Sequence, residues 1–191
     1  MPIRANEKAM NIYLVRHGEA AEHWHKADDP GLSELGYQQA AEIAQTLLPQ
    51  LGPDVRLISS PMLRARETAQ PLADALGISP TIVECFREIP TPVDRADRHE
   101  WLRTIALQNW QEQHAMVQDW RATLLAELGK VREHTVIFTH FMVLNAIVGS
   151  LQQRDRVVCF LPANASVTRL QWSGDAHELL ELGHQLKTRV N

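Results

Sequence analysis

At 191 residues, with 45% hydrophobic and 22% charged residues, the chain suits one globular domain, 1–191, with a single sizeable core. Its net charge of −4 excludes an overall basic field that would attract nucleic acid or an anionic membrane, so an anion site must be a local concentration of positive charge. No run approaches the roughly 18 apolar residues of a membrane span.

The first ten residues contain three charged side chains, Arg4, Glu7 and Lys8, and lack the apolar segment of a signal peptide, so we expect no secretory signal. The two cysteines, Cys85 and Cys159, cannot build a disulfide framework. We therefore expect a reduced, cytoplasmic location, and we interpret both cysteines as packing residues.

Strand-like and helix-like segments alternate along the chain. The first half predicts a strand over residues 11–16, a polar loop over 22–31, a helix capped by Ser33 and running to 48, a strand over 55–59, a helix from Pro61 to 76 that Gly77 ends, and a strand over 81–85. The second half predicts an irregular stretch at Pro90 and Pro92, helices between 98 and 128, a strand over 135–139, a helix over 142–151, two closing strands over 165–172 and 177–182, and a frayed polar end over 185–191. This alternation favours an α/β fold, a three-layer α/β/α sandwich with a mostly parallel central sheet.

The segment from about residue 90 to 130 interrupts this alternation. Its apolar residues recur at helical spacing, and Gly129 closes the pattern. Trp101, Trp110 and Trp120 lie within it, either as core residues or, for one indole, as a platform that stacks on a ligand. We expect a helical cap insertion that roofs the binding site.

Five polar side chains follow the ends of the predicted strands. Arg16 and His17 end the first strand, Arg64 follows the second, Glu88 follows the third and His140 ends the fourth. Because the carboxyl ends of parallel strands meet at one edge of a sheet, where ligands bind, we expect these side chains to share a cleft.

Two guanidiniums, two imidazoles and a carboxylate are suited to phosphoryl transfer. Arginine presents a planar fork that matches phosphate oxygens and stays charged. Histidine can attack phosphorus through one ring nitrogen when the N–H of the other is held. A carboxyl group with a raised pKa can protonate the leaving oxygen. This scheme needs no metal, and we interpret His23 and His25 as part of a polar loop rather than as metal ligands.

Five motifs in this order resemble the histidine phosphatase superfamily, which has the phosphoglycerate mutase-like fold, and the resemblance covers nearly the whole chain. The matching segments are RHGE at 16–19, GLSELGYQQA at 31–40, SSPMLRARETA at 59–69, TH at 139–140 and NASV at 164–167.

The resemblance implies roles for individual residues. His17 would be the catalytic nucleophile that becomes phosphohistidine, and Glu88 would be the proton donor. His140 would act with them and, like Arg16 and Arg64, would bind the phosphoryl group.

We also assign Glu19 and His23 to the phosphate-binding set, and we place Arg66 outside the site. Glu19, Glu84, Asp28 and Asp29 remain rivals of Glu88 for the role of the acid.

The chain departs from the family pattern at three places. Ala20 and His23 stand where many members have Thr and Asn, so His23 could replace a phosphate contact. Phe141 replaces the usual glycine after the second histidine, and residues 90–92 (PTP) replace a glycine- and aromatic-rich motif after Glu88. These departures leave the substrate class open.

The leading hypothesis is a metal-independent phosphatase that hydrolyses phosphomonoesters through a phosphohistidine at His17. The alternatives are a protein phosphohistidine phosphatase, a mutase, and a non-catalytic phosphate-binding or scaffold protein on the same fold. We expect a phosphorylated small molecule as the substrate, with a phosphoprotein as the alternative. We expect no cofactor and no nucleic-acid or membrane partner, and the sequence leaves the oligomeric state open.

Overall fold

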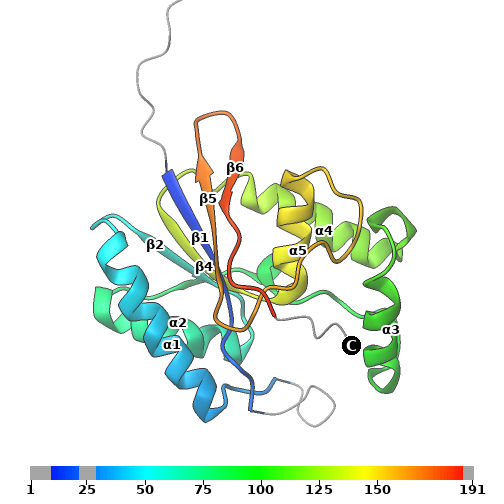
Figure 1. Cartoon of the computed structure of the whole chain (residues 1–191), viewed down its shortest axis with the longest axis horizontal. Coiled ribbons are helices and arrows are strands. Elements are labelled where there is room, and N and C mark those ends of the chain that lie inside the picture. The colour runs from blue at the N-terminus through cyan, green and yellow to red at the C-terminus, as the bar shows by residue number, and fades with distance from the viewer. Residues whose placement is uncertain (1–9, 22–28, 187–191) are drawn as a thin grey trace, which may run out of the picture.

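The central sheet contains six strands in the order β3-β2-β4-β1-β5-β6 (Figure 1). The computed structural model describes residues 10–21 and 29–186, so the predicted frayed end beyond residue 186 lies outside it. The parallel strands are β1 (Met10–Arg16), β2 (Arg56–Ser59), β3 (Thr81–Ile82) and β4 (Thr135–Thr139). The antiparallel strands are β5 (Val167–Trp172), which pairs with β1, and β6 (His177–Glu181), which pairs with β5. The mostly parallel sheet and its closing pair of strands are confirmed.

The strand register aligns the carboxyl ends of the three central parallel strands. Arg16 of β1 lies opposite Thr139 of β4, and Ser59 of β2 lies opposite Phe138. The residues that follow, including His17 and His140, therefore leave the sheet at the same edge.

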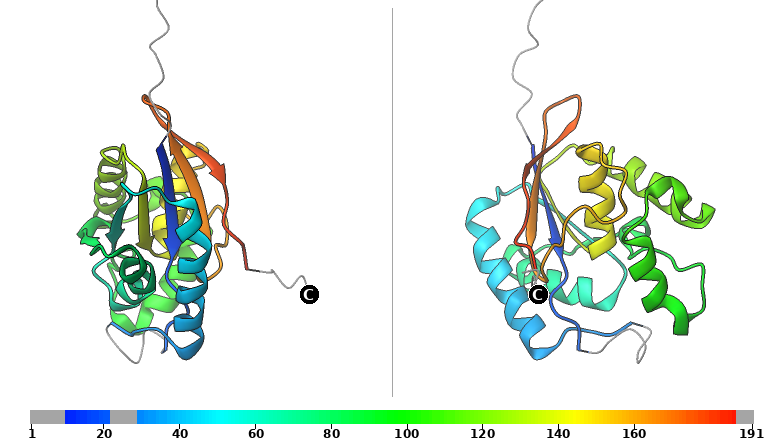
Figure 2. Two further views of the ribbon diagram at one scale, coloured as in Figure 1. Left: turned by 90° about the vertical axis from the view of Figure 1, so that its left-hand side faces the viewer. Right: turned by 45° about the vertical axis from the view of Figure 1, so that its right-hand side comes forward.

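Helices cover both faces of the sheet, which gives three layers (Figure 2). One face carries α1 (Glu34–Leu47), which continues into the 3-10 helix η1 (Leu48–Gln50), and α2 (Leu63–Leu76). The other face carries α4 (Ala115–Leu128) and α5 (Phe141–Leu151). Side chains of β1 alternate between the two cores: Tyr13 and Val15 pack on the α1 and α2 side, and Ile12 and Leu14 on the α5 side.

Local signals explain most helix ends. Ser33 caps α1 and accepts a hydrogen bond from the N–H of Gly36 at 3.0 Å. Gly77 ends α2 in the left-handed region, with φ of 68°. Pro61 lies just before α2 rather than in its first turn, because Met62 occupies the N-cap position.

The predicted third strand is wrong beyond residue 82. The chain turns into the 3-10 helix η2 (Glu84–Phe86), and this turn inserts the Phe86 ring into the core. The hydroxyl of Thr139 donates to the Phe86 carbonyl at 2.8 Å. Burial of the ring and this bond favour the turn over continued strand pairing.

The predicted insertion is confirmed as helical. It contains the 3-10 helix η3 (Arg95–Asp97), α3 (Arg98–Ile105), the 3-10 helix η4 (Trp110–Glu112) and α4. Trp110 is buried in the core, and Trp101 and Trp120 pack against that core; Trp120 also lines the cleft described below. The insertion therefore contributes both to the core and to the roof of the cleft.

Candidate active site

The two predicted imidazoles are neighbours at the carboxyl edge of the sheet. The ring centroids of His17 and His140 are 5.1 Å apart, and the ring planes are inclined by 58°. Both side chains are buried. Residues that are 123 positions apart in the sequence thus share one site.

The backbone fixes the ring of His17. Its Nδ1 lies 2.7 Å from the carbonyl oxygen of Gly18, an acceptor, so Nδ1 carries the proton and donates it. The Nε2 atom accepts from Nε of Arg64 at 3.2 Å, which fits the same tautomer. The lone pair of Nε2 therefore points toward the guanidinium and is the nucleophilic atom of this histidine.

Two contacts hold the peptide of Gly18 in place. Its N–H donates to the hydroxyl of Thr68 at 2.9 Å, and that hydroxyl donates to the carbonyl of Arg64 at 2.6 Å. A Cβ atom at Gly18 would lie 2.7 Å from the carbonyl oxygen of Gly36. The glycine is thus required by the close packing of this loop on the first turn of α1.

Arg64 links the two imidazoles. In addition to its bond to His17, its Nη2 lies 3.3 Å from Nδ1 of His140. The carboxylate of Asp29 lies 3.8 Å from Nη1 and accepts the backbone N–H of Leu63 at 3.0 Å. Because Arg64 lies in the first turn of α2, this carboxylate both caps the helix and orients the guanidinium.

Ser60 fixes the ring of His140. Since Nδ1 of His140 accepts from Arg64, the proton of this imidazole lies on Nε2, which donates to Oγ of Ser60 at 2.7 Å. Oγ of Ser60 also accepts the N–H of Met62 at 3.2 Å. The serine at the end of β2 therefore selects the tautomer of the histidine at the end of β4.

Arg16 is held between a carbonyl group and an aromatic ring. Its Nη1 donates to the carbonyl of Pro162 at 2.7 Å, and its guanidinium carbon lies 5.3 Å from the ring centroid of Phe141. The second distance falls within the range of cation–π attraction. Phe141, where the family pattern has glycine, thus gives the half-buried Arg16 side chain an aromatic neighbour.

Glu88 has the environment of a proton donor. It is buried, and its Oε1 accepts the backbone N–H groups of Ile89 at 3.0 Å and Met142 at 3.1 Å. Burial raises the pKa of Glu88, although these N–H groups and the guanidiniums of Arg64 and Arg98 lower it. With Oε1 engaged as an acceptor, Oε2 is the oxygen suited to carry the proton.

Burial and neighbouring cations keep both imidazoles neutral at pH 7. Burial, followed by the charges of Arg64 and Arg16, lowers the pKa of His17 to about 3. Burial also lowers the pKa of His140 to well below its usual value, with His17 and Arg64 adding to the effect. The Nε2 lone pair of His17 is therefore available as a nucleophile.

A cleft of about 460 Å³ lies in front of Arg64 and Glu88. The cap insertion contributes Val93, Arg95, Arg98 and Trp120 to its lining, and a further arginine, Arg87, and the acidic Glu84 also line it. The remaining lining residues are Pro30, Met62, Ile89, Pro90 and Thr91. Of the five side chains predicted to share a cleft, Arg64 and Glu88 line it, whereas Arg16, His17 and His140 are not among its lining residues. Arg64 connects the cleft to the two imidazoles, because it bonds to both of them.

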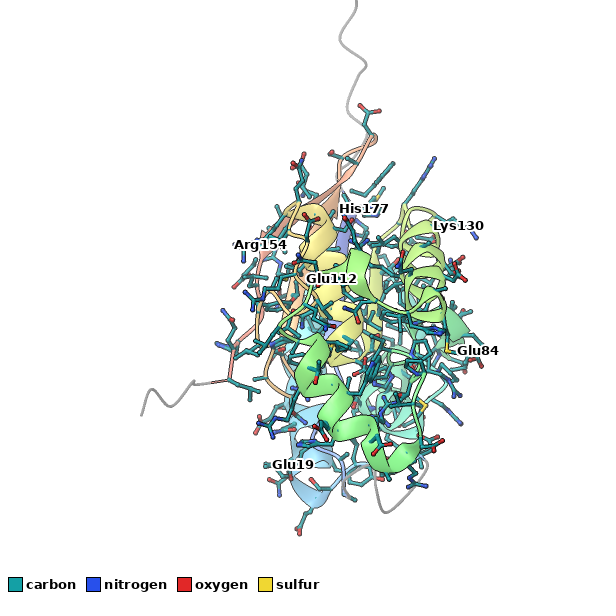
Figure 3. All side chains as sticks on the ribbon, turned by 90° about the vertical axis from the view of Figure 1, so that its right-hand side faces the viewer. Glu19, Glu84, Glu112, Lys130, Arg154 and His177 are labelled. Atoms are coloured by element: carbon teal, nitrogen blue, oxygen red, sulfur yellow. The ribbon has the colours of Figure 1, made fainter. Side chains whose placement is uncertain are left out.

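The rival acids have different environments. Glu19 is exposed and accepts from the hydroxyl of Ser33, the N-cap of α1, at 2.8 Å. Glu84 is exposed and pairs with Arg87 at 3.5 Å. In Figure 3, Glu19 lies beside the start of α1 and Glu84 lies at the surface near β3. The Asp29 carboxyl group lies 3.8 Å from Nη1 of Arg64. Glu88 is buried, and burial raises its pKa, as a proton donor requires.

The remaining predicted residues lie either outside the cleft or outside the described part of the chain. Arg66 is exposed on α2, outside the cleft, as expected. His23 and Asp28 lie outside the described residues. The assignment of Glu19 and His23 to the phosphate-binding set stays a prediction.

Sequence reasoning missed Ser60, Thr68 and the pairing of Asp29 with Arg64. The two hydroxyl residues lie in the matched 59–69 segment, and Thr68 follows Arg64 by one helical turn, a spacing that could have suggested contact. The sequence suggests only an acid role for Asp29, because nothing in its spacing indicates that it caps a helix 34 residues away.

Within residues 10–21 and 29–186, no group of three His, Cys, Asp or Glu side chains is placed to hold a metal ion. None of the helices in these described segments is both long and apolar enough to span a bilayer.

Comparisons with known proteins give a consistent result. Residues 12–185 match the sequence model of the histidine phosphatase superfamily (branch 1). A probable phosphoglycerate mutase GpmB from Erwinia tasmaniensis is 29% identical over 176 residues, which cover 82% of this chain and 78% of that protein. A PE-PGRS family protein from Mycobacterium tuberculosis is 36% identical over 89 residues, 44% of this chain but only 15% of its own length.

Solved structures share the fold. A phosphoserine phosphatase from Entamoeba histolytica, solved in complex with 3-phosphoglyceric acid, superimposes with a TM-score of 0.69 at 20% identity. The match covers 92% of this chain and 98% of the other.

Proposed function

The chain belongs to branch 1 of the histidine phosphatase superfamily, and we propose that it is a metal-independent phosphatase that hydrolyses phosphomonoesters through a phosphohistidine at His17. One observation carries this proposal. The Nδ1–H of His17 is held by a backbone carbonyl while its Nε2 lone pair faces the Arg64 guanidinium, opposite the second imidazole. A neutral, oriented nucleophile beside phosphate-binding donors is what attack on phosphorus requires.

In the first step, the guanidiniums of Arg16 and Arg64 bind the phosphoryl group. Nδ1 of His140 leaves Arg64, takes up a proton from solvent, which the anion stabilises, and donates it in a hydrogen bond to a phosphoryl oxygen. The Nε–H of Arg64 moves from Nε2 of His17 to a phosphoryl oxygen, which frees the lone pair. A bond forms between Nε2 and phosphorus as the bond between phosphorus and the ester oxygen breaks. The guanidiniums offset the charge on the equatorial oxygens.

Glu88 moves the proton in both steps. Its Oε2 donates a proton to the leaving ester oxygen, so the alcohol departs neutral. A water molecule then attacks phosphorus, gives its proton to the Glu88 carboxylate, and breaks the bond to His17. Inorganic phosphate leaves, and both residues return to their initial protonation states.

The alternatives differ in what accepts or supplies the phosphoryl group. A mutase, as the name of the Erwinia relative suggests, would return the phosphoryl group to a sugar acid rather than to water. A protein phosphohistidine phosphatase would accept a phosphoprotein, and a scaffold protein would bind phosphate without turnover. We propose hydrolysis of a small molecule as the main activity, in the cytoplasm.

The test traps the intermediate. Brief incubation with a ³²P-labelled phosphomonoester is expected to give protein-bound label that is acid-labile and base-stable, with release of inorganic phosphate. His17→Ala should carry no label and show no turnover, whereas His99→Ala, at an exposed position of α3, should behave as the wild type. Label and turnover that persist in His17→Ala would refute the proposal. Isomerisation of a phosphoglycerate without net phosphate release would instead identify a mutase.

A further inference from the structure

A second groove, of about 540 Å³, lies on the face of the sheet that carries α1. One of its walls is α1 with η1, and the other is formed by β5, by the end of β6 and by the residues that follow β6. Among the described residues, this groove and the cleft in front of Glu88 share no lining residue. The proposed phosphatase mechanism therefore leaves the groove without a role.

The side chain of Tyr13, on β1, lines the groove from the sheet although it is only 3% exposed. Arg169 packs on its ring, with the guanidinium carbon 5.9 Å from the ring centroid. The Tyr13 hydroxyl has no hydrogen-bond partner in the described part of the chain, and it is not among the polar atoms that the protein encloses completely. A buried tyrosine hydroxyl usually has a partner, so this one is suited to bind a molecule in the groove.

Three amide side chains also line the groove: Gln39 of α1, Gln50 of η1 and Asn164 before β5. Oε1 of Gln39 accepts the N–H of Glu19 at 2.8 Å, and Nε2 of Gln50 donates to the carbonyl of Thr46 at 2.8 Å. Gln39 therefore keeps a donor, Nε2, and Gln50 keeps an acceptor, Oε1. The amide of Asn164 has no hydrogen-bond partner among the described residues and offers both a donor and an acceptor.

The charges in the groove nearly cancel. Among the described lining residues the one arginine, Arg169, pairs with Glu181 at 3.3 Å, and the other carboxylate, Glu42, is exposed. Four arginines line the cleft in front of Glu88 instead. Phosphorylated molecules are therefore attracted to the cleft, and the groove favours neither an anion nor a cation.

Both walls of the groove also hold the loop that carries the nucleophile. On one side Gln39 holds the N–H of Glu19, as described above. On the other side the N–H of Ala165 donates to the carbonyl of His17 at 3.2 Å. Ala165 has a φ of 58°, in the left-handed region that residues with a Cβ rarely adopt, so this contact belongs to a strained turn. A molecule bound to Gln39 and Asn164 would touch both supports of the loop.

We propose that this groove is a second binding site, for an uncharged, hydroxyl-rich small molecule of the sugar or cyclic polyol class, and that its occupancy stabilises the loop of His17 in the conformation seen here. Each hydroxyl group both donates and accepts a hydrogen bond, which matches the mixture of free donors and acceptors in the groove. The apolar side chains of Ile43, Leu47 and Leu182 also line it and would contact the C–H groups of the ring.

Three sugars with the same ring and different charges test the class of ligand. D-Glucose is neutral, D-glucuronate is an anion and D-glucosamine is a cation, and ligand-observed NMR with the full chain compares their binding at millimolar concentrations. We expect D-glucose to bind at least as tightly as either charged sugar. Tighter binding of a charged sugar would overturn the class of ligand. Absence of binding by both D-glucose and myo-inositol would overturn the site.

Variants locate the binding. Thr46→Trp places an indole at an exposed position of α1 that lines the groove, and it should abolish binding. Gln45→Trp introduces the same ring at the neighbouring exposed position, outside the lining, and should leave binding unchanged. Tyr13→Phe removes only a hydroxyl and should weaken binding about two- to tenfold, as for a hydrogen bond between neutral groups. Equal binding by the wild type and all three variants would overturn the site.

The link to the nucleophile loop has its own measurement. If the bound sugar stabilises this loop, the affinity for inorganic phosphate should rise by about fivefold or more in saturating D-glucose, and phosphate should tighten the binding of D-glucose by the same factor. Thr46→Trp should lose this effect, and Gln45→Trp should keep it. A phosphate affinity that D-glucose leaves unchanged would overturn the link. Since every readout is a binding measurement, the result does not depend on whether the protein hydrolyses an ester.

Discussion

Replacing Glu88 by glutamine should separate proton transfer from the structural contacts of this side chain. Glutamine has the same shape, and its Oε1 can still accept the N–H groups of Ile89 and Met142. The substitution therefore removes the proton and leaves these contacts in place. General acid catalysis contributes roughly 10²- to 10⁴-fold, so hydrolysis of an alkyl phosphate should slow by about that factor. This factor corresponds to about 2.7 to 5.4 kcal/mol of transition-state stabilisation.

The leaving group provides the internal control. The p-nitrophenolate ion leaves as a stable anion and needs little protonation, so p-nitrophenyl phosphate should lose only about threefold in Glu88→Gln. Steady-state kcat/KM values for this ester and for glycerol 3-phosphate, measured side by side, give the comparison. Equal losses on the two esters would show that Glu88 is not the acid.

The pH profile gives a second reading of the same residue. The acid form of Glu88 donates, and burial raises its pKa above the ordinary glutamate value. In the wild type, kcat/KM for an alkyl phosphate should therefore fall as the pH rises through that pKa. In Glu88→Gln, kcat/KM should not change with pH over this range. If the same fall persists in this variant, another group is titrating.

Three further predictions concern the residues around the nucleophile. Thr68→Val leaves the buried N–H of Gly18 without its acceptor, so the free energy of unfolding measured with urea should fall by about 1 to 3 kcal/mol. The value of kcat should fall as well, because the Gly18 peptide orients His17. An unchanged kcat would show that the hydroxyl does not contribute to the site. Phe141→Leu removes the aromatic ring beside Arg16 and with it a cation–π attraction of ~0.5–2 kcal/mol, so the inhibition constant of phosphate should rise several-fold. Phe141→Tyr keeps the ring and should leave this constant unchanged. The pKa of His17 is about 3 in the folded chain. Since that pKa is about 6.5 when unfolded, stability should fall as the pH drops from 6.5 toward 3, by up to about 1.4 kcal/mol per unit; an equally steep fall in His17→Asn would contradict the assignment.

The order of strands and helices could be predicted from the sequence because each signal is local. Alternating apolar runs, the Ser33 cap and the Gly77 end need only neighbouring residues. The predicted third strand is too long, because the composition of residues 81–85 is typical of a strand. The turn that replaces its end depends on the burial of Phe86 and on a contact with Thr139, 53 positions away.

The site could be predicted only as far as strand ends determine it. The pairing of parallel strands brings His17 and His140 to one edge of the sheet, independently of the conformation of the loops that follow. The tautomers of both rings instead depend on the Gly18 carbonyl and the Ser60 hydroxyl. These contacts arise from loop conformation and packing, which leave no periodic signal in the sequence.

A crystal structure of the protein with orthovanadate tests most directly whether the two imidazoles and the guanidiniums hold a single phosphoryl group. We predict vanadium bonded to Nε2 of His17, with its oxygens contacting Arg16, Arg64 and His140, and with the Arg64 Nε–H moved off the histidine. Vanadate found elsewhere in the cleft, with the Arg64 bridge between the imidazoles intact, would contradict the account.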